Sequence, residues 1–157
     1  MNKYMEIAKR LADENIITNA GGPFGACVVK DGKIIGKGSN HVIKNNDPTA
    51  HAEIQAIRDA CHNIKSYDLT GCQLYTTCYP CPMCLSAIIW ANIKKVYYGN
   101  CKEDAEKIGF RDVFIYKYID NLSKKINDKT LDMKNIDRNE TIETFKNFMN
   151  KDDKTIY

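Results

Sequence analysis

The sequence is poor in the features that would place it in a membrane or outside the cell. It contains four prolines, one tryptophan and three histidines among 157 residues. No apolar run is long enough to cross a bilayer, which argues against an integral membrane protein. The stretch MNKYMEIAKRLADEN at the amino terminus mixes charges into an amphipathic pattern and has no signal-peptide core. We therefore expect a cytoplasmic protein that does not bind membranes.

Charge of one sign is also scarce. The chain has 23 Lys and Arg against 20 Asp and Glu, a formal net charge of +3 that is spread along its length. Nucleic-acid-binding domains usually concentrate basic residues on one face, so this composition does not favour such a partner. With 43% hydrophobic and 27% charged residues, the chain is typical of a folded protein. Its length suits one domain.

Cysteine, in contrast, is abundant. Seven cysteines are an odd number for a disulfide framework, and disulfides are rare in reducing compartments. Three of them, Cys78, Cys81 and Cys84, stand at intervals of three in YTTCYPCPMC (75–84). One C-x-x-C pair could be redox-active, one could bind metal, or all three thiols could share a metal.

Alternating hydrophobic periodicities predict an α/β fold in which helices pack on a sheet. Asp31-Gly32 is a turn signal between the two apolar runs of a hairpin. Asp47, Pro48 and Thr49 supply start signals for a helix. The expected elements are helices over 3–15, 47–61, 81–92 and 141–150, a hairpin over 25–40, and strands over 72–77 and 94–100.

A metal site is predicted where two of these helices begin. Cys81 and Cys84 are three residues apart, so both can face one point from the first turn of their helix. His51 lies near the start of the preceding helix, and Zn²⁺ favours imidazole and thiolate ligands in tetrahedral sites. We predict that these three residues bind one Zn²⁺ per chain and leave the fourth position open to water.

Glu53 makes this site a candidate catalyst. Zinc lowers the pKa of bound water from ~16 towards ~7. Glu53, two residues from His51, could take a proton from that water and return it to a substrate nitrogen. The pattern H-x-E…P-C-x-x-C, formed here by His51, Glu53, Pro80, Cys81 and Cys84, is the signature of zinc deaminases.

Each residue also has a simpler interpretation. His51 alone could be a partly buried histidine, and Glu53 alone a solvated helix residue. Cys78 could be the fourth ligand of a closed structural zinc site, but that arrangement leaves Glu53 without a role. A redox pair at Cys81 and Cys84 is disfavoured because no β-α-β pattern follows. We therefore favour a catalytic zinc, with Cys78 close to the metal and not bound to it.

Beyond the zinc motif, GGPFGACVVKDGKIIGKGSN, NDPTAHAEIQAIRDAC, CYPCPMCLSAIIWA and GFRDVFIY resemble the cytidine deaminase superfamily. They are most similar to the short bacterial guanine deaminases, and the resemblance extends to FKNFMNKDDKTIY at the end of the chain. It implies a three-layer α/β/α sandwich, cytidine deaminase-like, with a mixed sheet and helices on both faces. It also implies hydrolytic deamination of guanine to xanthine and ammonia.

The resemblance assigns further roles. Asn40 would hydrogen-bond the purine, Phe24 would pack against its ring, and Asp112 would accept from its amino or ring N–H group. Residues 1–157 would form a single deaminase domain, whose segment 120–157 is exchanged with a partner subunit in a homodimer. Tyr157 would then reach the partner's site. Simpler alternatives are a turn residue for Asn40, a helix N-cap for Asp112 and a frayed terminus for Tyr157.

Three positions depart from the resemblance. Tyr79 stands where Glu is common, Ser86 where Gly is usual, and Arg111 where an acidic residue is common. These departures bear on the substrate more than on the chemistry. Guanosine, cytosine, another small amino-heterocycle or adenosine in tRNA are therefore alternative substrates. A non-catalytic, zinc-stabilised binding module is the alternative from a different functional class.

Overall fold

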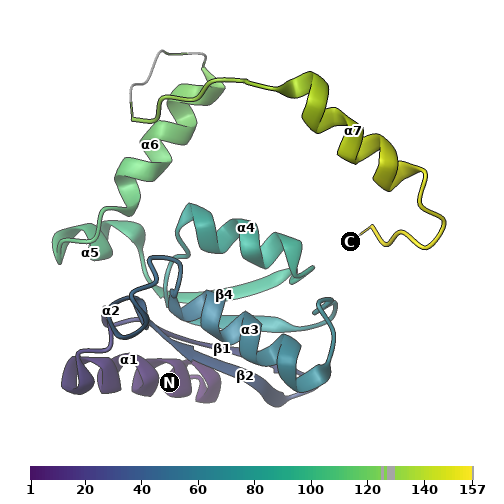
Figure 1. Cartoon of the computed structure of the whole chain (residues 1–157). Coiled ribbons are helices and arrows are strands. Elements are labelled where there is room, and N and C mark those ends of the chain that lie inside the picture. Colours follow the sequence, from purple (N-terminus) through teal and green to yellow (C-terminus); the bar gives the residue numbers. More distant parts are fainter. Residues whose placement is uncertain (125, 127–129, 157) are drawn as a thin grey trace. The chain divides into compact units, whose positions relative to one another are not determined.

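The computed structural model describes residues 1–124, 126 and 130–156, which fall into two compact units, Met1–Asp120 and Asn121–Tyr157 (Figure 1). The elements are α1 (Lys3–Thr18), β1 (Gly25–Lys30), β2 (Lys33–Ser39), α2 (Val42–Asn45), α3 (Ala52–Ile64), β3 (Gln73–Cys78), α4 (Pro82–Trp90), β4 (Lys95–Asn100), α5 (Lys102–Lys107), α6 (Asp112–Ser123) and α7 (Arg138–Met149). Among the described residues, no helix is long and apolar enough to cross a membrane.

The first unit is built on a mixed four-stranded sheet of order β2-β1-β3-β4. β1 runs antiparallel to β2 and β3, whereas β3 and β4 are parallel. Asp31 and Gly32 both adopt positive φ, as the predicted hairpin turn requires. α1 packs on one face of the sheet, and α3 and α4 lie on the other (Figure 1). The predicted α/β/α sandwich is therefore confirmed.

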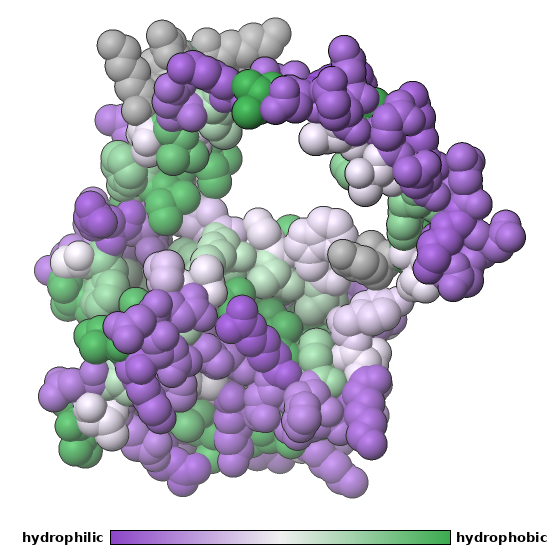
Figure 2. Space-filling view, in the orientation of Figure 1, coloured by the Kyte–Doolittle hydropathy of each residue, from purple (hydrophilic) through white to green (hydrophobic). Residues whose placement is uncertain are grey.

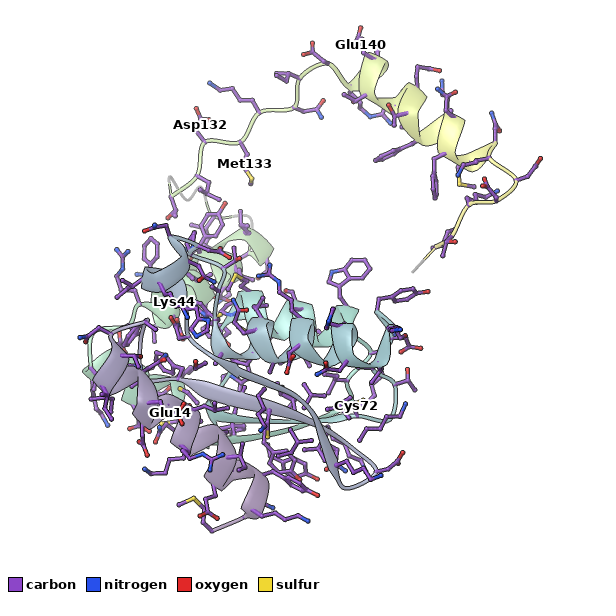
Figure 3. The ribbon with its side chains drawn as sticks, turned by 60° about the horizontal axis from the view of Figure 1, so that its bottom comes forward. Glu14, Lys44, Cys72, Asp132, Met133 and Glu140 are labelled. Atoms are coloured by element: carbon purple, nitrogen blue, oxygen red, sulfur yellow. The ribbon has the colours of Figure 1, made fainter. Side chains whose placement is uncertain are left out.

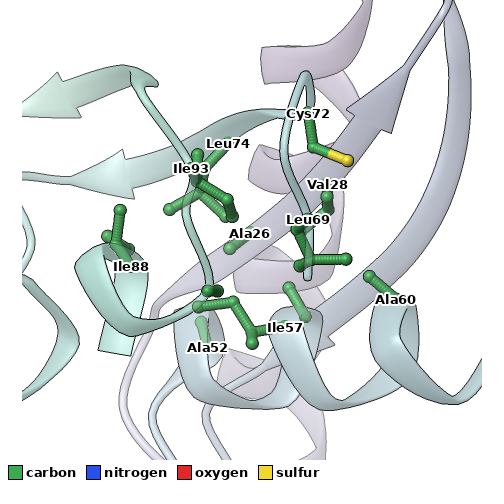
Figure 4. Close-up of a cluster of buried hydrophobic side chains, with 12 residues drawn as sticks. Ala26, Val28, Ala52, Ile57, Ala60, Leu69, Cys72, Leu74, Ile88 and Ile93 are labelled. Atoms are coloured by element: carbon green, nitrogen blue, oxygen red, sulfur yellow. The ribbon is translucent and has the colours of Figure 1, made fainter. Parts of the chain in front are cut away.

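The core of this unit lies on the two faces of the sheet. Because successive strand residues point to opposite faces, Leu74 and Thr76 of β3 face α3, while Tyr75 and Thr77 face the α1 side. Tyr75 packs with Cys27 and Val29 on the α1 side. The larger cluster, on the α3 and α4 side, contains Ala26, Val28, Ala52, Ala56, Ile57, Ala60, Leu69, Cys72, Leu74, Ile88, Ala91 and Ile93 (Figure 4).

Glycines in β2 set the position of α3. A Cβ atom on Gly38 would collide with the carbonyl oxygen of Ala52, and one on Gly36 would collide with that of Ala56. Both alanines are fully buried. Small side chains on the helix, opposite glycines without side chains on the strand, allow close contact. α3 therefore lies directly on the sheet.

The start of α3 differs from the prediction. The helix begins at Ala52 and not at Asp47. The Asp47 carboxylate accepts hydrogen bonds from the backbone N–H and the hydroxyl of Thr49, at 2.8 and 2.7 Å, which closes a turn of the kind that Asp favours. The short helices α2 and α5, and α6, lie where the sequence analysis placed no element.

The surface of the first unit is charged over its outer helices and apolar over α6. Glu14 of α1 and Lys44 of α2 project from it (Figure 3). Figure 2 shows hydrophobic side chains gathered over α6, where Phe114, Ile115 and Ile119 are exposed.

The second unit contains α7, the helix that the sequence predicts near the end of the chain. Its apolar stripe includes Phe145, Phe148 and Met149, which are 70%, 42% and 58% exposed. Asp132, Met133 and Glu140 are also exposed (Figure 3). A unit of this size exposes most of its hydrophobic side chains because it has little core of its own.

Candidate metal centre and substrate pocket

Two helix N-termini meet at the candidate metal centre. His51 is the N-cap residue of α3, and Cys81 is the N-cap residue of α4. Neither side chain makes a capping hydrogen bond, so both are available as ligands. Pro82 occupies the first turn of α4, where its missing N–H costs nothing. The positive ends of both helix dipoles also stabilise thiolate at this point.

His51, Cys81 and Cys84 form a compact set of donors. Their ligand atoms all lie within 4.8 Å of one another. His51 Nδ1 is 3.5 Å from Cys81 Sγ and 3.7 Å from Cys84 Sγ. One imidazole and two thiolates are a ligand set that zinc prefers, and three protein ligands are typical of a catalytic site with an open position. The donor set therefore fits the predicted zinc ion.

Cys78 lies outside this set of donors. Its Sγ atom is directed to the carbonyl oxygen of Cys101, at 3.6 Å, and it is absent from the cluster that could hold a metal. Burial raises its pKa to about 11. This geometry fits a buried neighbour of the site better than a fourth ligand.

Glu53 lies against the donor set, and its carboxylate is shielded from solvent. Its side chain is buried, with 6% of the residue exposed. Oε1 accepts a hydrogen bond of 3.0 Å from the Thr76 hydroxyl, and Oε2 accepts one of 3.4 Å from the Cys84 thiol. Burial raises the pKa of Glu53. A raised pKa favours the protonated form, which suits a group that has to take up a proton and pass it on.

The pKa values of Cys81 and Cys84 are shifted in opposite directions. The hydrogen bond from the Cys84 thiol, followed by the one with His51, lowers the pKa of Cys81 to about 4. The pKa of Cys84 is raised, since its proton is shared with Cys81 and it is buried. The hydrogen bond with Cys81 raises the pKa of His51. Metal binding has to displace the protons that remain on the three ligands.

A cavity of about 460 Å³ opens beside these groups. All of its lining residues belong to the first unit, and none of them is Lys or Arg. They include every predicted substrate-contacting residue except Tyr157, which lies outside the described residues. The lining is Gly21, Gly22, Phe24, Asn40, Val42, Ile43, Pro48, His51, Glu53, Cys78, Tyr79, Cys81, Phe110 and Asp112.

Asn40 is held in one orientation at the wall of this cavity. Its Oδ1 accepts a 3.1 Å hydrogen bond from the backbone N–H of Val42, and its carbonyl oxygen accepts one of 2.7 Å from Asn15 Nδ2. Gly21 packs so closely on the amide that a Cβ atom would collide with Oδ1. Since Oδ1 is already bonded, the Asn40 amide nitrogen is the group that is left to donate to a ligand.

Two aromatic rings and one carboxylate complete the pocket. Phe24 and Phe110 pack edge to face, with ring centroids 4.7 Å apart. Asp112, the first residue of α6, is partly buried, and burial raises the pKa of its carboxyl group. A flat apolar wall, a fixed amide donor and a carboxylate acceptor suit a planar heterocycle that carries both acceptors and N–H groups.

Sequence reasoning did not identify three residues around the site. Phe110 stands in GFRD but had no assigned role, Thr76 reads as an ordinary strand residue, and Tyr116 hydrogen-bonds Pro80 beside the metal loop. Tyr79, one of the departures from the resemblance, lines the cavity and packs edge to face on Tyr98. The alternation of LYTTC could have placed Thr76 on the same face of its strand as Leu74.

Known proteins match this chain over most of its length. Guanine deaminase of Bacillus subtilis (strain 168) is 47% identical over 151 residues, which are 94% of this chain and 95% of that protein. The X-ray structure of guanine deaminase from Bacillus subtilis matches with a TM-score of 0.91 and 45% identity, over 100% of this chain and 99% of the other. tRNA-specific adenosine deaminase of Buchnera aphidicola subsp. Schizaphis graminum is 44% identical over 126 residues, 80% of this chain and 79% of that one.

The profile of the family described as "Cytidine and deoxycytidylate deaminase zinc-binding region" matches residues 1–100. That range contains His51, Glu53, Cys81 and Cys84, so the family match and the clustered donors coincide. The resemblance seen in the sequence is confirmed, and the chain belongs to the zinc-binding cytidine and deoxycytidylate deaminase family.

Proposed function

We propose that this protein hydrolyses guanine to xanthine and ammonia. The observation that carries the proposal is a buried carboxylate, Glu53, hydrogen-bonded to Cys84 of a set of metal donors in the wall of one cavity. The similarity to guanine deaminase of Bacillus subtilis over nearly the full length of both chains supports this choice of substrate.

His51, Cys81 and Cys84 would hold the zinc ion. When bound, zinc supplies a nucleophile at neutral pH by lowering the pKa of a water molecule. Two thiolates offset the charge of the metal, and both helix N-termini support the thiolate form. The protein therefore contributes three ligands and leaves space for the substrate on the cavity side.

Glu53 moves the protons. The net reaction adds one water: a C–O bond forms at the purine carbon that bears the amino group, and the C–N bond to that amino group breaks. Glu53 takes a proton from the attacking water and delivers it to the adjacent ring nitrogen. Glu53 then moves the second proton of the added water, from the new hydroxyl group on the carbon, to the amino group, which leaves as ammonia. The raised pKa of the buried carboxyl suits a group that has to be protonated in one step and ionised in the next.

The pocket reads the purine through Asn40, Asp112 and Phe24. Guanine offers acceptors at N7 and O6, whereas adenine offers a donor where guanine has O6. The bond from Val42 to Asn40 Oδ1 leaves the Asn40 amide nitrogen as a donor, which suits the guanine acceptors. Asp112 accepts from N–H groups of the base, and Phe24 packs against the ring.

Deamination of adenosine in tRNA is the second candidate, because the relative from Buchnera aphidicola is named a tRNA-specific adenosine deaminase. RNA binding relies on cationic contacts to phosphates. No Lys or Arg lines the cavity in the part of the chain that the structure describes. A small free base is therefore the better substrate for this pocket.

An ammonia-release assay over a substrate panel tests the proposal. We expect guanine to be turned over most efficiently among guanine, guanosine, adenine, cytosine, cytidine and a tRNA anticodon stem-loop. Glu53→Gln serves as the inactive control for contaminating deaminases. Preference for cytosine or for the tRNA stem-loop, or no ammonia from any compound, would contradict the proposal.

We also propose a cytoplasmic homodimer in which residues 120–157 are exchanged between subunits. The exposed stripe of α7 with Phe145, Phe148 and Met149 supports an apolar partner surface, and exchange of identical segments is a low-cost route to dimers. Tyr157 would close the partner's pocket. Seven cysteines without a disulfide fit a reducing compartment.

A further inference from the structure

The Thr76 side chain is the one hydroxyl that contacts Glu53 among the described residues. Thr76 lies in the middle of β3 and is 1% exposed. Its Oγ1 atom donates a 3.0 Å hydrogen bond to Glu53 Oε1. Because β3 is an inner strand between β1 and β4, its backbone is held on both sides. The hydroxyl is therefore presented from a strand that is hydrogen-bonded along both edges.

We propose that Thr76 is a positioning residue for catalysis, which fixes the Glu53 carboxylate through Oε1 and leaves Oε2 to carry the proton. The inference rests on the proposed deamination. It gives strand β3 a direct part in the site, in addition to its place in the core and in the sheet.

The two oxygens of Glu53 have unequal partners. Oε2 is bonded to the Cys84 thiol at 3.4 Å, but Cys84 has to lose its proton to become a metal ligand. A thiolate cannot donate a hydrogen bond, so that contact ends when the site is loaded. The Thr76 hydroxyl is not a ligand and keeps its proton. The bond to Oε1 therefore remains to orient the carboxylate, together with the hydrogen bond from the backbone N–H of Glu53 itself.

The burial of Glu53 makes the bond from Thr76 important. A buried carboxylate without hydrogen bonds loses the stabilisation that water would provide. Its side chain also has several rotatable bonds, and an oriented proton carrier has to lie within hydrogen-bond reach of its target. With Oε1 held, rotation about the last bond is restricted, and Oε2 faces the metal donors and the cavity.

A purely structural role for Thr76 is the competing explanation. Threonine is common in strands because a β-branched side chain packs well there, and its methyl group could be what β3 needs. Thr77 allows the two explanations to be separated. It stands next in the same strand and is also buried. Its side chain points to the opposite face of the sheet from Thr76, and its hydroxyl accepts a 3.1 Å hydrogen bond from the backbone N–H of Gly25.

The experiment compares Thr76→Val, Thr76→Ser and Thr77→Val, with zinc content measured for each. Thr76→Val keeps the branched shape and removes the hydroxyl. We expect its kcat for guanine to fall about 10- to 100-fold, which corresponds to the loss of a hydrogen bond to a charged group, with KM and zinc content unchanged. Thr76→Ser restores the hydroxyl and should recover kcat to within a few-fold. Thr77→Val should keep kcat.

A crystal structure of Thr76→Val provides a readout that does not depend on activity. We expect the Glu53 carboxylate to rotate or to occupy more than one conformer, while the zinc donors stay in place. An ordered Glu53 with unchanged kcat in Thr76→Val would overturn the proposal. So would a Thr77→Val variant that loses as much activity, or a Thr76→Ser variant that recovers none.

Failure of the positioning role is distinguishable from failure of the proposed function. If the wild-type protein deaminates another base from the panel, the three variants are compared on that base. If it deaminates none, the crystal structure still reports whether Glu53 is disordered without the Thr76 hydroxyl. The panel thus tests the substrate, and the variants test the carboxylate.

Discussion

The Tyr116 hydroxyl of α6 donates a 2.7 Å hydrogen bond to the carbonyl oxygen of Pro80, the residue that precedes Cys81. Asp112 stands one helical turn before Tyr116 on the same face of α6, since residues four apart are neighbours on a helix. The same helix thus holds the metal loop with one residue and offers a carboxylate to the substrate pocket with the other.

The first prediction follows from this pair. Tyr116→Phe should release α6 from the metal loop and let Asp112 move from its position in the pocket. We expect KM for guanine to rise about three- to tenfold, consistent with the loss of a hydrogen bond worth about 1 kcal/mol, while the zinc content stays at one per chain. Steady-state kinetics and elemental analysis measure both.

Tyr118→Phe is the matched control. It makes the same change two residues further along α6, at a buried hydroxyl without a hydrogen-bond partner among the described residues. We expect no change in KM for this variant. Equal effects of the two substitutions would show that the Pro80 contact has no special part in placing Asp112.

The second prediction concerns the three cysteines of the metal loop. Cys81→Ser and Cys84→Ser should lose zinc, because a serine hydroxyl is a poor replacement for a thiolate ligand. Cys78→Ser should retain one zinc per chain, since the Cys78 thiol faces the Cys101 carbonyl oxygen. Elemental analysis of the purified variants decides. Loss of zinc from Cys78→Ser would mean a closed structural site and would refute the hypothesis of a catalytic zinc.

Much of the metal centre could be predicted because its information is local. His51 and Glu53 are two residues apart, Cys81 and Cys84 three, and each pair lies at the start of a helix that the sequence predicts. The predicted start of α3 was wrong because Asp and Thr, found here as Asp47 and Thr49, are favoured both as helix caps and in turns. Competing local structures of equal plausibility are settled by packing, here of Ala52 on Gly38.

The supporting contacts could not be predicted because their partners are distant along the chain. Tyr116 and Pro80 are 36 positions apart, and Thr76 and Glu53 are 23 apart. No periodicity links such residues. They meet because α3 lies on β3 and because α6 returns to the metal loop, and both facts depend on the whole fold. The polar segment from residue 120 gave no sign that α6 extends to Ser123.

The third prediction concerns removal of the metal. Chelation should destabilise the first unit, since a ligand that binds only the folded state contributes about 2.7 kcal/mol at a concentration 100-fold above its Kd. For a chain of this size that corresponds to a fall in Tm of roughly 5 to 10 °C. Differential scanning calorimetry measures the shift, and added zinc should reverse it.

Acid should have the same effect as the chelator. As pH falls, protons compete with the metal for Cys81, Cys84 and His51, and the raised pKa of His51 makes its protonation easier. Zinc loss should therefore increase steadily as pH falls. A Tm that is unaffected by chelation at neutral pH would show that the metal does not contribute to folding.

The fourth prediction separates Glu53 from the ligands. Glu53→Gln removes the proton carrier but keeps its size and its contact with Thr76. We expect zinc to be retained and turnover to fall by at least ~10² to 10⁴-fold, the usual contribution of general acid–base catalysis. Single-turnover assays on the zinc-loaded variant measure the loss. A Glu53→Gln enzyme within tenfold of wild type would remove Glu53 from the catalytic mechanism.

The last prediction concerns the end of the chain and tests the exchange of segments directly. A chain that lacks residues 154–157 should keep its zinc and its dimeric state but lose activity, because the proposed cap of the partner's pocket is gone. Glu53→Gln keeps the tail but has no proton carrier. In a dimer formed from these two chains, the truncated subunit has an intact Glu53 and receives the tail of its partner. Random exchange of subunits makes half of the dimers mixed. Each mixed dimer has one complete site of its two, so about one quarter of the activity of the same amount of wild-type dimer should return. If the tail acts within its own subunit, no site in the mixture is complete and nothing returns. Mixing the truncated chain with a truncated Glu53→Gln chain controls for exchange alone. Full activity of the truncated homodimer, or an active monomer in solution, would show that the tail does not close a partner's site.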